Sequence, residues 1–264
     1  MRDDGGPGGA GRAGKRGMRA SIQAIECYFP QRRLTNEELA AQFPEWPAEK
    51  IEEKTGIATR HIAAEEETSG DLGYEAARRL LESGACAAEE VDFLIFCTQS
   101  PDYFLPATAC VLQRRLGLPV TAGALDMNQG CSGWVYGLSL ARGLIESGQA
   151  RRVLLVTAET YSKFMHPDDK GRRTVFGDGA AATLVAAAEE GGNVLGEFIF
   201  GTDGRGEDKL IVRTGAFRRR AAAGEAPGAD AFGNLRSPDY LYMNGPEIFH
   251  FTLRAVPQAV EQIL

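Results

Sequence analysis

Cys131 is the residue whose type and setting point most directly to chemistry. It stands between Gly130 and Gly133 in NQGCSG, where a short apolar strand at 122–127 gives way to a helical pattern at 132–147. The nucleophile in cysteine catalysis is the thiolate, which a helix N-terminus favours while its backbone N–H groups face a developing oxyanion. The glycines remove side chains on both flanks, so we expect a bulky substrate to reach the sulfur and the turn to tolerate strain. The pattern predicts covalent catalysis by Cys131.

The alternative for Cys131 is a small buried residue at a helix start, because free cysteine is among the most buried residue types. The chain has no CxxC pair, and its three histidines form no HExxH motif, so we expect no metal site and no cofactor. Without an export signal, the cysteines are expected to be free thiols in a reducing cytoplasm. The other four lie in apolar stretches, as structural cysteines do: Cys27, Cys86, Cys97 and Cys110.

Composition limits the classes of partner. The 264 residues are 44% hydrophobic and 25% charged, enough for a sizeable core, and the formal net charge is −7. That charge argues against nucleic acid or a membrane surface as a general partner, and no apolar run approaches the roughly 18 residues of a membrane span. Residues 1–19 are rich in Gly and Arg, which predicts a disordered tail rather than a signal peptide, with Met18 as an alternative start.

Strand and helix patterns alternate along the chain. Continuous apolar runs such as VDFLIFCTQ and RRVLLVTAE are typical of strands buried on both faces, as in parallel sheets. The alternation predicts an α/β fold around a mostly parallel central sheet. We expect strands at 20–30, 91–99, 122–127, 151–159, 179–189 and 194–202, and helices at 35–42, 48–54, 71–83, 108–116 and 132–147.

A partial internal repeat divides the chain. The helix at 71–83 leads through a short acidic loop into a buried strand, and residues 246–264 again show one apolar helical face. We expect one complete unit at 20–214, a solvated surface loop at 215–234 and the opening of a second unit at 235–264. The apolar face of the last helix needs a partner.

Six stretches together resemble the 3-oxoacyl-acyl carrier protein synthase III family of the thiolase superfamily. The resemblance implies a thiolase-like αβαβα layered fold of two similar halves, usually in a homodimer. It also implies that an acyl-CoA primer acylates Cys131, and that malonyl-acyl carrier protein then loses carbon dioxide and attacks the thioester. The stretches are EKTGIATRHIAA (53–64), FLPATACVLQRRLG (104–117), DMNQGCSGWVYGLSLA (126–141), RRVLLVTAETYSK (151–163), TVFGDGAAATLV (174–185) and MNGPEIFHFTL (243–253).

The resemblance also assigns substrate-binding roles to single residues. Leu105 matches a residue that reaches across the dimer to line the partner's acyl pocket, where leucine in place of an aromatic side chain favours a different or longer primer. Phe176 matches a residue of the acyl pocket. Lys54 and Lys170, with Gly171 beside it, match positions near the CoA entrance, where a cation suits phosphate groups. The alternatives are dimer packing for Leu105, plain core for Phe176 and solvated surface for the lysines.

Two further matches concern the pantetheine arm and the adenine of CoA. Asn244 and Gly245 match the segment against which the pantetheine arm packs, although Pro246 replaces the family's usual asparagine and one contact is expected to be lost. Trp46 is displaced from the tryptophan that stacks on adenine in the family, so this role is not assigned to it.

The remaining machinery of the family is a His and an Asn in the second half and a glycine-rich segment near the C-terminus. The resemblance places the His motif just beyond Leu264. His61, His166 and His250 lie in other contexts, and none is expected to replace it. A fragment of a longer protein is the expectation, ahead of a separate completing chain or a degraded gene.

Three other functions stay open. A thiolase-fold acyltransferase would use the same cysteine to pass an acyl group to a hydroxyl or amine without decarboxylation. A non-catalytic partner subunit would keep the fold for assembly, but such subunits often lose the cysteine that this chain retains. An HMG-CoA synthase would need a catalytic glutamate near residues 70–80, and Glu75 shows no sign of that role.

Overall fold

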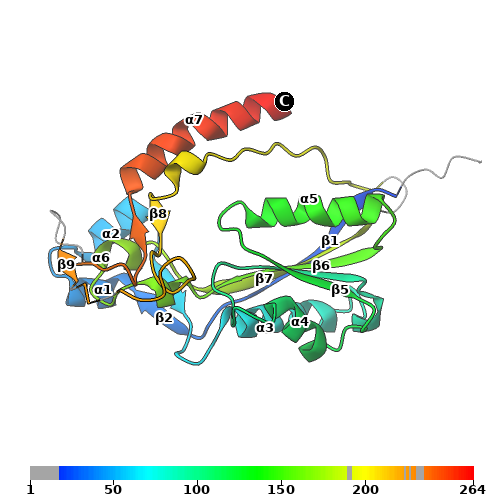
Figure 1. The fold of residues 1–264 in the computed structure, drawn as a ribbon, viewed down its shortest axis with the longest axis horizontal. Helices are drawn as coiled ribbons and strands as arrows, with labels where there is room; N and C mark the ends of the chain where they lie inside the picture. Colours follow the sequence, from blue (N-terminus) through cyan, green and yellow to red (C-terminus); the bar gives the residue numbers. More distant parts are fainter. Residues whose placement is uncertain (1–17, 189–191, 223, 226, 230–234) are drawn as a thin grey trace, which may run out of the picture.

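The continuous apolar runs form the middle of a five-stranded sheet in the computed structural model (Figure 1), which describes residues 18–188, 192–222, 224–225, 227–229 and 235–264. Most of the expected tail at 1–19 therefore lies outside the described residues. The strand order is β1–β7–β6–β4–β5. The strands are β1 (Ala20–Tyr28), β4 (Phe93–Cys97), β5 (Gly123–Met127), β6 (Arg152–Glu159) and β7 (Gly179–Ala187).

The sheet is mixed: β1, β4, β5 and β6 run in the same direction, in line with the prediction of a mostly parallel sheet, and β7 runs in the opposite direction. β4 runs parallel to β5 and β6, whereas β7 runs antiparallel to both β6 and β1. The reason lies in the connection from β6 to β7. Its short helices, η2 (Tyr161–Phe164) and α6 (Lys170–Arg173), do not cross a face of the sheet, so the chain re-enters in the opposite direction.

Helices cover both faces of this sheet, as the alternation predicted. α3 (Ser69–Glu82) and α4 (Thr108–Arg115) lie on one face, and α5 (Gly133–Glu146) lies on the other (Figure 1). A capping box between Thr68 and Asp71 starts α3. Each face has its own core. The fully or almost fully buried residues that repeat along these helices are Leu72, Ala76 and Leu80 on α3 and Leu138, Ala141 and Ile145 on α5.

A smaller group of elements stands at one end of the sheet. The expected helices are confirmed as α1 (Asn36–Gln42) and α2 (Ala48–Thr55). They pack beside an antiparallel pair that the sequence did not predict, β2 (Arg32–Thr35) and β3 (Thr59–Ile62). Four residues give too short an alternation to reveal a strand. The buried centre of this group is Leu34, Leu39 and Ile51.

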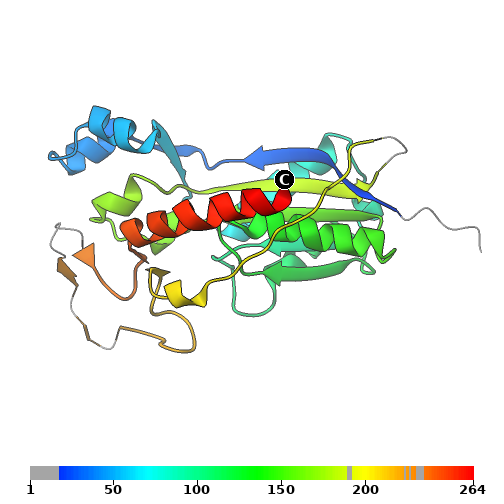
Figure 2. The ribbon, with the colours of Figure 1, turned by 90° about the horizontal axis from the view of Figure 1, so that it is seen from above.

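The strand expected at 194–202 is not formed, so this prediction was wrong. Leu195 N–H donates to Ala20 O, which is the only backbone–backbone bond of this segment within the described chain. The apolar side chains of the segment pack on the α5 side instead, with the rings of Phe200 and Tyr136 5.0 Å apart between centroids. The segment consequently passes over α5 rather than joining the sheet (Figures 1 and 2).

The C-terminal part of the chain contains short pairs and one long helix. The expected surface loop at 215–234 is partly outside the described residues, and its described part forms only a two-residue strand, β9, and an isolated bridge. The short elements, including the one between α3 and β4, are η1 (Ala88–Glu90), η3 (Gly204–Gly206), β8 (Leu210–Ile211), β9 (Gly228–Ala229), β10 (Leu235–Arg236) and β11 (Tyr242–Met243). β8 pairs with β11, and β9 pairs with β10.

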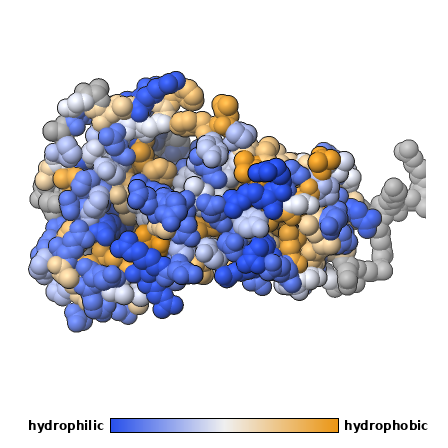
Figure 3. All heavy atoms as spheres, turned by 90° about the horizontal axis from the view of Figure 1, so that it is seen from below, coloured by the Kyte–Doolittle hydropathy of each residue, from blue (hydrophilic) through white to orange (hydrophobic). Residues whose placement is uncertain are grey.

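The helix expected at 246–264 is confirmed as α7 (Gly245–Ile263), on the same side of the sheet as α5 (Figure 1). None of its residues is buried, and Phe249 and Leu253 are 61% and 57% exposed. Within the described chain, no helix is both long and apolar enough to cross a membrane. The face that carries α3 and α4 is largely hydrophilic, with apolar side chains in small groups (Figure 3).

Candidate active site

The turn between β5 and α5 presents Cys131. β5 ends at Met127 and α5 begins at Gly133, and Cys131 is exposed, unlike a buried structural cysteine. Its backbone N–H donates to no acceptor among the described residues, and Ser132 makes no side-chain capping bond at the start of α5. The turn therefore offers a sulfur together with free N–H groups at a helix N-terminus, a setting suited to nucleophilic attack and oxyanion binding.

Gly130 and Gly133 allow close packing, so the expectation of a strained turn was wrong. Neither residue has a positive φ. A Cβ at Gly133 would lie 2.4 Å from Cys97 Sγ, and one at Gly130 would lie 2.8 Å from Gln99 Oε1. Burial raises the pKa of the Cys97 thiol to about 11, and this thiol donates to Gln129 O at 3.3 Å. The side chain of Cys97, at the end of β4, and that of Gln99, just after it, thus form the floor of the turn.

Glu159, the last residue of β6, holds the backbone behind this floor. Its Oε1 accepts from Gln99 N at 2.8 Å and its Oε2 accepts from Ser100 Oγ at 2.9 Å. Burial raises the pKa of Glu159 to about 7 against the effect of these hydrogen bonds, and the charge of Asp178 adds to the rise. Sequence reasoning missed this residue. Its signal was a glutamate at the end of an otherwise apolar buried strand.

An open cavity of about 920 Å³ adjoins the floor of the turn, with Gln99 and Tyr161 in its wall. Tyr161 Oη donates to Gln99 Oε1 at 3.1 Å. Burial raises the pKa of Tyr161 to about 12, with smaller contributions from Glu159 and Cys131, so the nucleophile is within electrostatic reach of this wall. Apolar side chains give the cavity a surface suited to an acyl chain, among them Phe104, Leu105, Phe164, Ile211 and Val212.

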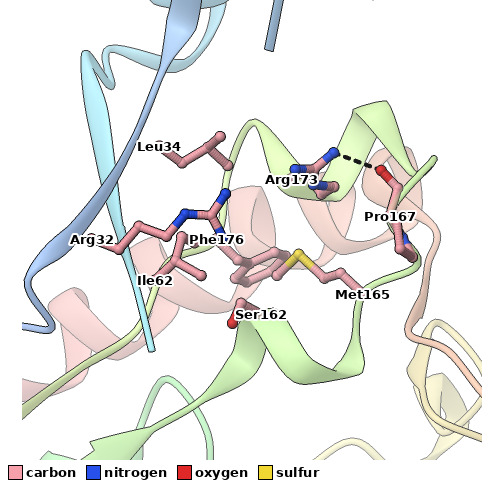
Figure 4. A pocket seen from close by; sticks show the side chains of 8 residues that line it. All are labelled: Arg32, Leu34, Ile62, Ser162, Met165, Pro167, Arg173 and Phe176. Atoms are coloured by element: carbon pink, nitrogen blue, oxygen red, sulfur yellow. Dashed lines mark hydrogen bonds between the residues drawn. The ribbon is translucent and has the colours of Figure 1, made fainter. Parts of the chain in front are cut away.

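The structure separates the two residues that the resemblance assigned to the acyl pocket. Leu105 is 80% exposed and lines the large cavity. Phe176 lines a second pocket of about 270 Å³ (Figure 4). The ring of Tyr161 lies between them, since it lines the large cavity and packs on Phe176 with centroids 5.1 Å apart.

Two arginines that the sequence did not single out share the pocket of Phe176. Arg32 comes from β2 and Arg173 from the end of α6, and Figure 4 shows both beside Phe176. Arg173 Nη1 donates to Pro167 O at 2.6 Å. Burial, and then the charge of Arg32, lower the pKa of Arg173.

The two lysines assigned to the CoA entrance contact adjacent residues, Trp46 and Glu45. Lys54 Nζ lies 5.8 Å from the ring centroid of Trp46, and Lys50 Nζ lies 5.7 Å from the same ring. Lys170 Nζ forms an ion pair with Glu45 Oε1 at 2.8 Å. Lys54 therefore offers a cation against a partly buried aromatic ring, whereas the charge of Lys170 is already paired.

The other assigned residues lie where α6 meets the start of α7. Arg172 Nη2 donates to Met243 O at 2.9 Å, which places Gly171 and Asn244 on neighbouring segments. Asn244 caps α7, because its Oδ1 accepts a backbone N–H of the first turn at 3.3 Å, and Gly245 is the first helical residue. The side chain of Asn244 thus has a structural partner of its own.

The three histidines make their contacts away from the nucleophile turn. His61 Nδ1 lies 2.5 Å from Pro30 O, and the ring of His166 packs edge-on against Tyr240. His250 is exposed on α7. None of these contacts involves Cys131.

Known proteins are similar to this chain in both sequence and fold. Residues 125–204, which include the nucleophile turn, match the family model for 3-oxoacyl-[acyl-carrier-protein (ACP)] synthase III. The chain is similar to the beta-ketoacyl-[acyl-carrier-protein] synthase III of Deinococcus deserti, with 40% identity over 92% of this chain and 65% of that protein. The chain therefore spans slightly less than two thirds of the length of this relative.

Solved structures give the same result. A crystal structure of a 3-oxoacyl-(acyl-carrier-protein) synthase III superposes with a TM-score of 0.90 and 56% identity, covering 93% of this chain and 73% of that one. A 3-oxoacyl-(acyl-carrier protein) synthase from Burkholderia xenovorans LB400 superposes with a TM-score of 0.83 and 36% identity, covering 94% of this chain and 69% of that one. The chain belongs to the 3-oxoacyl-acyl carrier protein synthase III family and has its thiolase-like fold.

Proposed function

We propose that Cys131 is the acyl-carrying nucleophile of a decarboxylating condensing enzyme. Its thiolate attacks the carbonyl carbon of an acyl-CoA thioester, the free N–H of Cys131 binds the oxyanion, and CoA leaves as a thiolate. Malonyl-acyl carrier protein then loses carbon dioxide, and its carbanion attacks the acyl-cysteine. A carbon–carbon bond forms, the Cys131 thiolate is released and the product is 3-oxoacyl-acyl carrier protein.

The turn between β5 and α5 carries this proposal. An exposed cysteine with an unpaired N–H at an uncapped helix start is arranged for acylation, and the large apolar cavity next to its floor has room for the acyl chain. The names of the relatives favour condensation over a plain acyltransferase. The intact nucleophile turn argues against a non-catalytic partner subunit.

The proposal also covers the partners and the other assigned residues. Acyl-CoA and acyl carrier protein are the substrates, Leu105 contacts the acyl chain and Lys54 a phosphate of CoA. Phe176 would act through Tyr161, and Lys170 would first have to leave Glu45. Gly171, Asn244 and Gly245 flank the pantetheine arm. Free thiols at all five cysteines suit the reducing cytoplasm, and the open edge of β5 suits a homodimer.

Intact-mass spectrometry after incubation with a panel of acyl-CoAs tests the acylation step. We expect one acyl adduct on the wild-type chain and none on Cys131→Ala. Cys110→Ala is the matched control, because Cys110 is also exposed and free, and it should retain the adduct. An adduct that survives in Cys131→Ala, or a well-folded wild-type chain that no acyl-CoA labels, would contradict the proposal.

A further inference from the structure

Gln99 is the polar side chain that the structure fixes most closely beside the nucleophile turn. Its backbone N–H donates to Glu159 Oε1 at 2.8 Å, and its Oε1 accepts from Tyr161 Oη at 3.1 Å. Its amide group also packs against Gly130, where a Cβ would lie 2.8 Å from Oε1 and 3.5 Å from Nε2. The first bond fixes the backbone of Gln99, and the other two contacts hold its amide in one orientation beside Gly130, the residue that precedes Cys131.

These contacts use the oxygen of the amide and leave its nitrogen free. Gln99 Nε2 donates to no acceptor in the described part of the chain, and the carboxylate of Glu159 is engaged by Gln99 N and Ser100 Oγ. Gln99 lines the cavity of about 920 Å³, whose wall here also includes Phe104 and Leu105. An oriented amide donor thus borders a largely apolar cavity close to the nucleophile.

We propose that Gln99 Nε2 donates a hydrogen bond to an oxygen atom of the acyl chain carried by Cys131, so that this chain selects primers with a keto or hydroxyl oxygen over plain hydrocarbon primers. The inference rests on the proposed function, since it concerns the acyl group that Cys131 accepts. A hydrocarbon primer would cover the amide N–H groups without giving them an acceptor, and a polar donor left unpaired on burial opposes binding.

The test compares acylation rates for three primers of equal carbon number. Butyryl-CoA, 3-hydroxybutyryl-CoA and 4-hydroxybutyryl-CoA are each incubated with the wild-type chain, and the adduct on Cys131 is followed by intact mass. We expect the better of the two hydroxylated primers to react about tenfold faster than butyryl-CoA, a ratio in the range of one hydrogen bond.

Two variants separate the amide nitrogen from the rest of Gln99. Gln99→Met keeps the length of the side chain and removes the donor, and it should abolish the preference by slowing the hydroxylated primer about tenfold while butyryl-CoA reacts at least as fast as before. Gln99→Glu keeps an acceptor for Tyr161 but has no amide donor. Because a hydroxylated primer can donate to the new carboxylate, this variant is tested with acetoacetyl-CoA, whose keto oxygen only accepts, and it should lose the wild-type preference for that primer over butyryl-CoA. Gln99→Glu decides the point if Gln99→Met fails to fold.

Three results would overturn the inference. One is a wild-type chain that takes butyryl-CoA as fast as both hydroxylated primers. Another is a variant that slows all three primers equally, which would make the amide a ligand of the thioester carbonyl common to all of them. The third is a Gln99→Met variant that keeps the preference for a hydroxylated primer, or a Gln99→Glu variant that keeps the preference for acetoacetyl-CoA. Each leaves Cys131 acylated and the proposed function intact, whereas a wild-type chain that no primer labels would remove both.

Discussion

Two cysteines near the nucleophile turn show how environment assigns different tasks to the same side chain. Cys97 is buried, its pKa is raised to about 11, and its thiol donates to Gln129 O. Cys131 is exposed at a helix start and has no such partner. The first is a protonated packing group and the second is available as a nucleophile, because reactivity follows exposure and thiolate character.

Gly133 is predicted to be essential because Cys97 occupies the space of its missing side chain. Gly133→Ala would place Cβ 2.4 Å from Cys97 Sγ, so the turn must shift. We expect a loss of about 1–3 kcal/mol in the free energy of unfolding, as for other overpacked sites, with slower acylation of Cys131. Denaturant unfolding and intact-mass kinetics measure the two effects.

A double variant provides the control for this steric argument. Cys97→Ala removes the sulfur that blocks Gly133→Ala, so the two changes together should be less harmful than the sum of their separate costs. If the double variant were as unstable as that sum, the clash with Cys97 Sγ would not be the cause.

The raised pKa of Glu159 predicts that the stability of the folded chain depends on pH. Its pKa is about 7 in the folded chain against 4.5 as the ordinary value, so the folded state holds a proton that the unfolded state has lost between these two pH values. The stabilising contribution is complete below about pH 4.5 and is lost as the pH rises through about 7, by roughly 3 kcal/mol at most. Unfolding free energies measured from pH 5 to pH 8 should show this decline.

Glu159→Gln removes the titration and keeps an acceptor for Gln99 N. The part of the decline that belongs to Glu159 should disappear in this variant, leaving a flatter profile between pH 5 and pH 7.5. Glu75→Gln is a suitable comparison, since Glu75 carries a surface ion pair with Arg78. A Glu159→Gln profile as steep as the wild-type one would refute the assignment.

Whether the sequence revealed a site residue depended on how far apart along the chain its neighbours in the structure lie. Cys131 was found because its glycines and the strand and helix around it are local. Gln99 and Glu159 were missed because they lie 60 residues apart along the chain and about 30 residues from Cys131. Only the pairing of β4 with β6 brings the ends of these two strands together. No local pattern encodes a contact of that kind.

At the scale of elements, Asp126 joins β5 to α4. α4 has no side-chain cap of its own at Ala107, and the carboxylate of Asp126 accepts from Thr108 N and Ala109 N, both at 2.7 Å. A negative charge at a helix N-terminus satisfies free donors and the helix dipole. The same bonds anchor the loop that carries Leu105 into the cavity.

Asp126→Ala should therefore affect both stability and acylation. We expect a loss of about 1–3 kcal/mol in the free energy of unfolding, the cost of charge-assisted capping bonds, and slower acylation with longer primers because the loop of Leu105 is less ordered. Asp126→Asn keeps one acceptor, so its free energy of unfolding should lie between those of Asp126→Ala and the wild-type chain. Equal stability of Asp126→Ala and the wild-type chain in thermal or urea unfolding would contradict the capping role.

The elements that were mispredicted share a cause. The types of β1, β4, β6 and β7 followed from composition and length, but the direction of β7 depended on where the preceding connection lies. The segment at 194–202 has the composition of a strand, but its apolar side chains pack on the α5 side of the sheet. Tertiary packing, which local pattern does not contain, decided both cases.

At the scale of the whole molecule, β5 is an open edge of the sheet. Gly123 N donates to Asp92 O and Met127 O accepts from Thr98 N, so these two residues bond inward to β4. Because backbone directions alternate along a strand, Ala124 and Asp126 direct their N–H and C=O groups outward. Such an edge can pair with the same edge of a second copy about a two-fold axis, which is the homodimer proposed above.

Ala124→Pro is predicted to break that dimer while leaving the β4–β5 ladder intact. Proline removes the outward N–H of Ala124 and places its ring at the free edge, where an unpaired strand tolerates it. Sedimentation velocity should give twice the mass of one chain for the wild type and the mass of one chain for Ala124→Pro. Ala124→Ser keeps the N–H and should stay dimeric. A wild-type chain that sediments as a monomer at micromolar concentration, or an Ala124→Pro variant that remains a dimer, would show that β5 is not the interface.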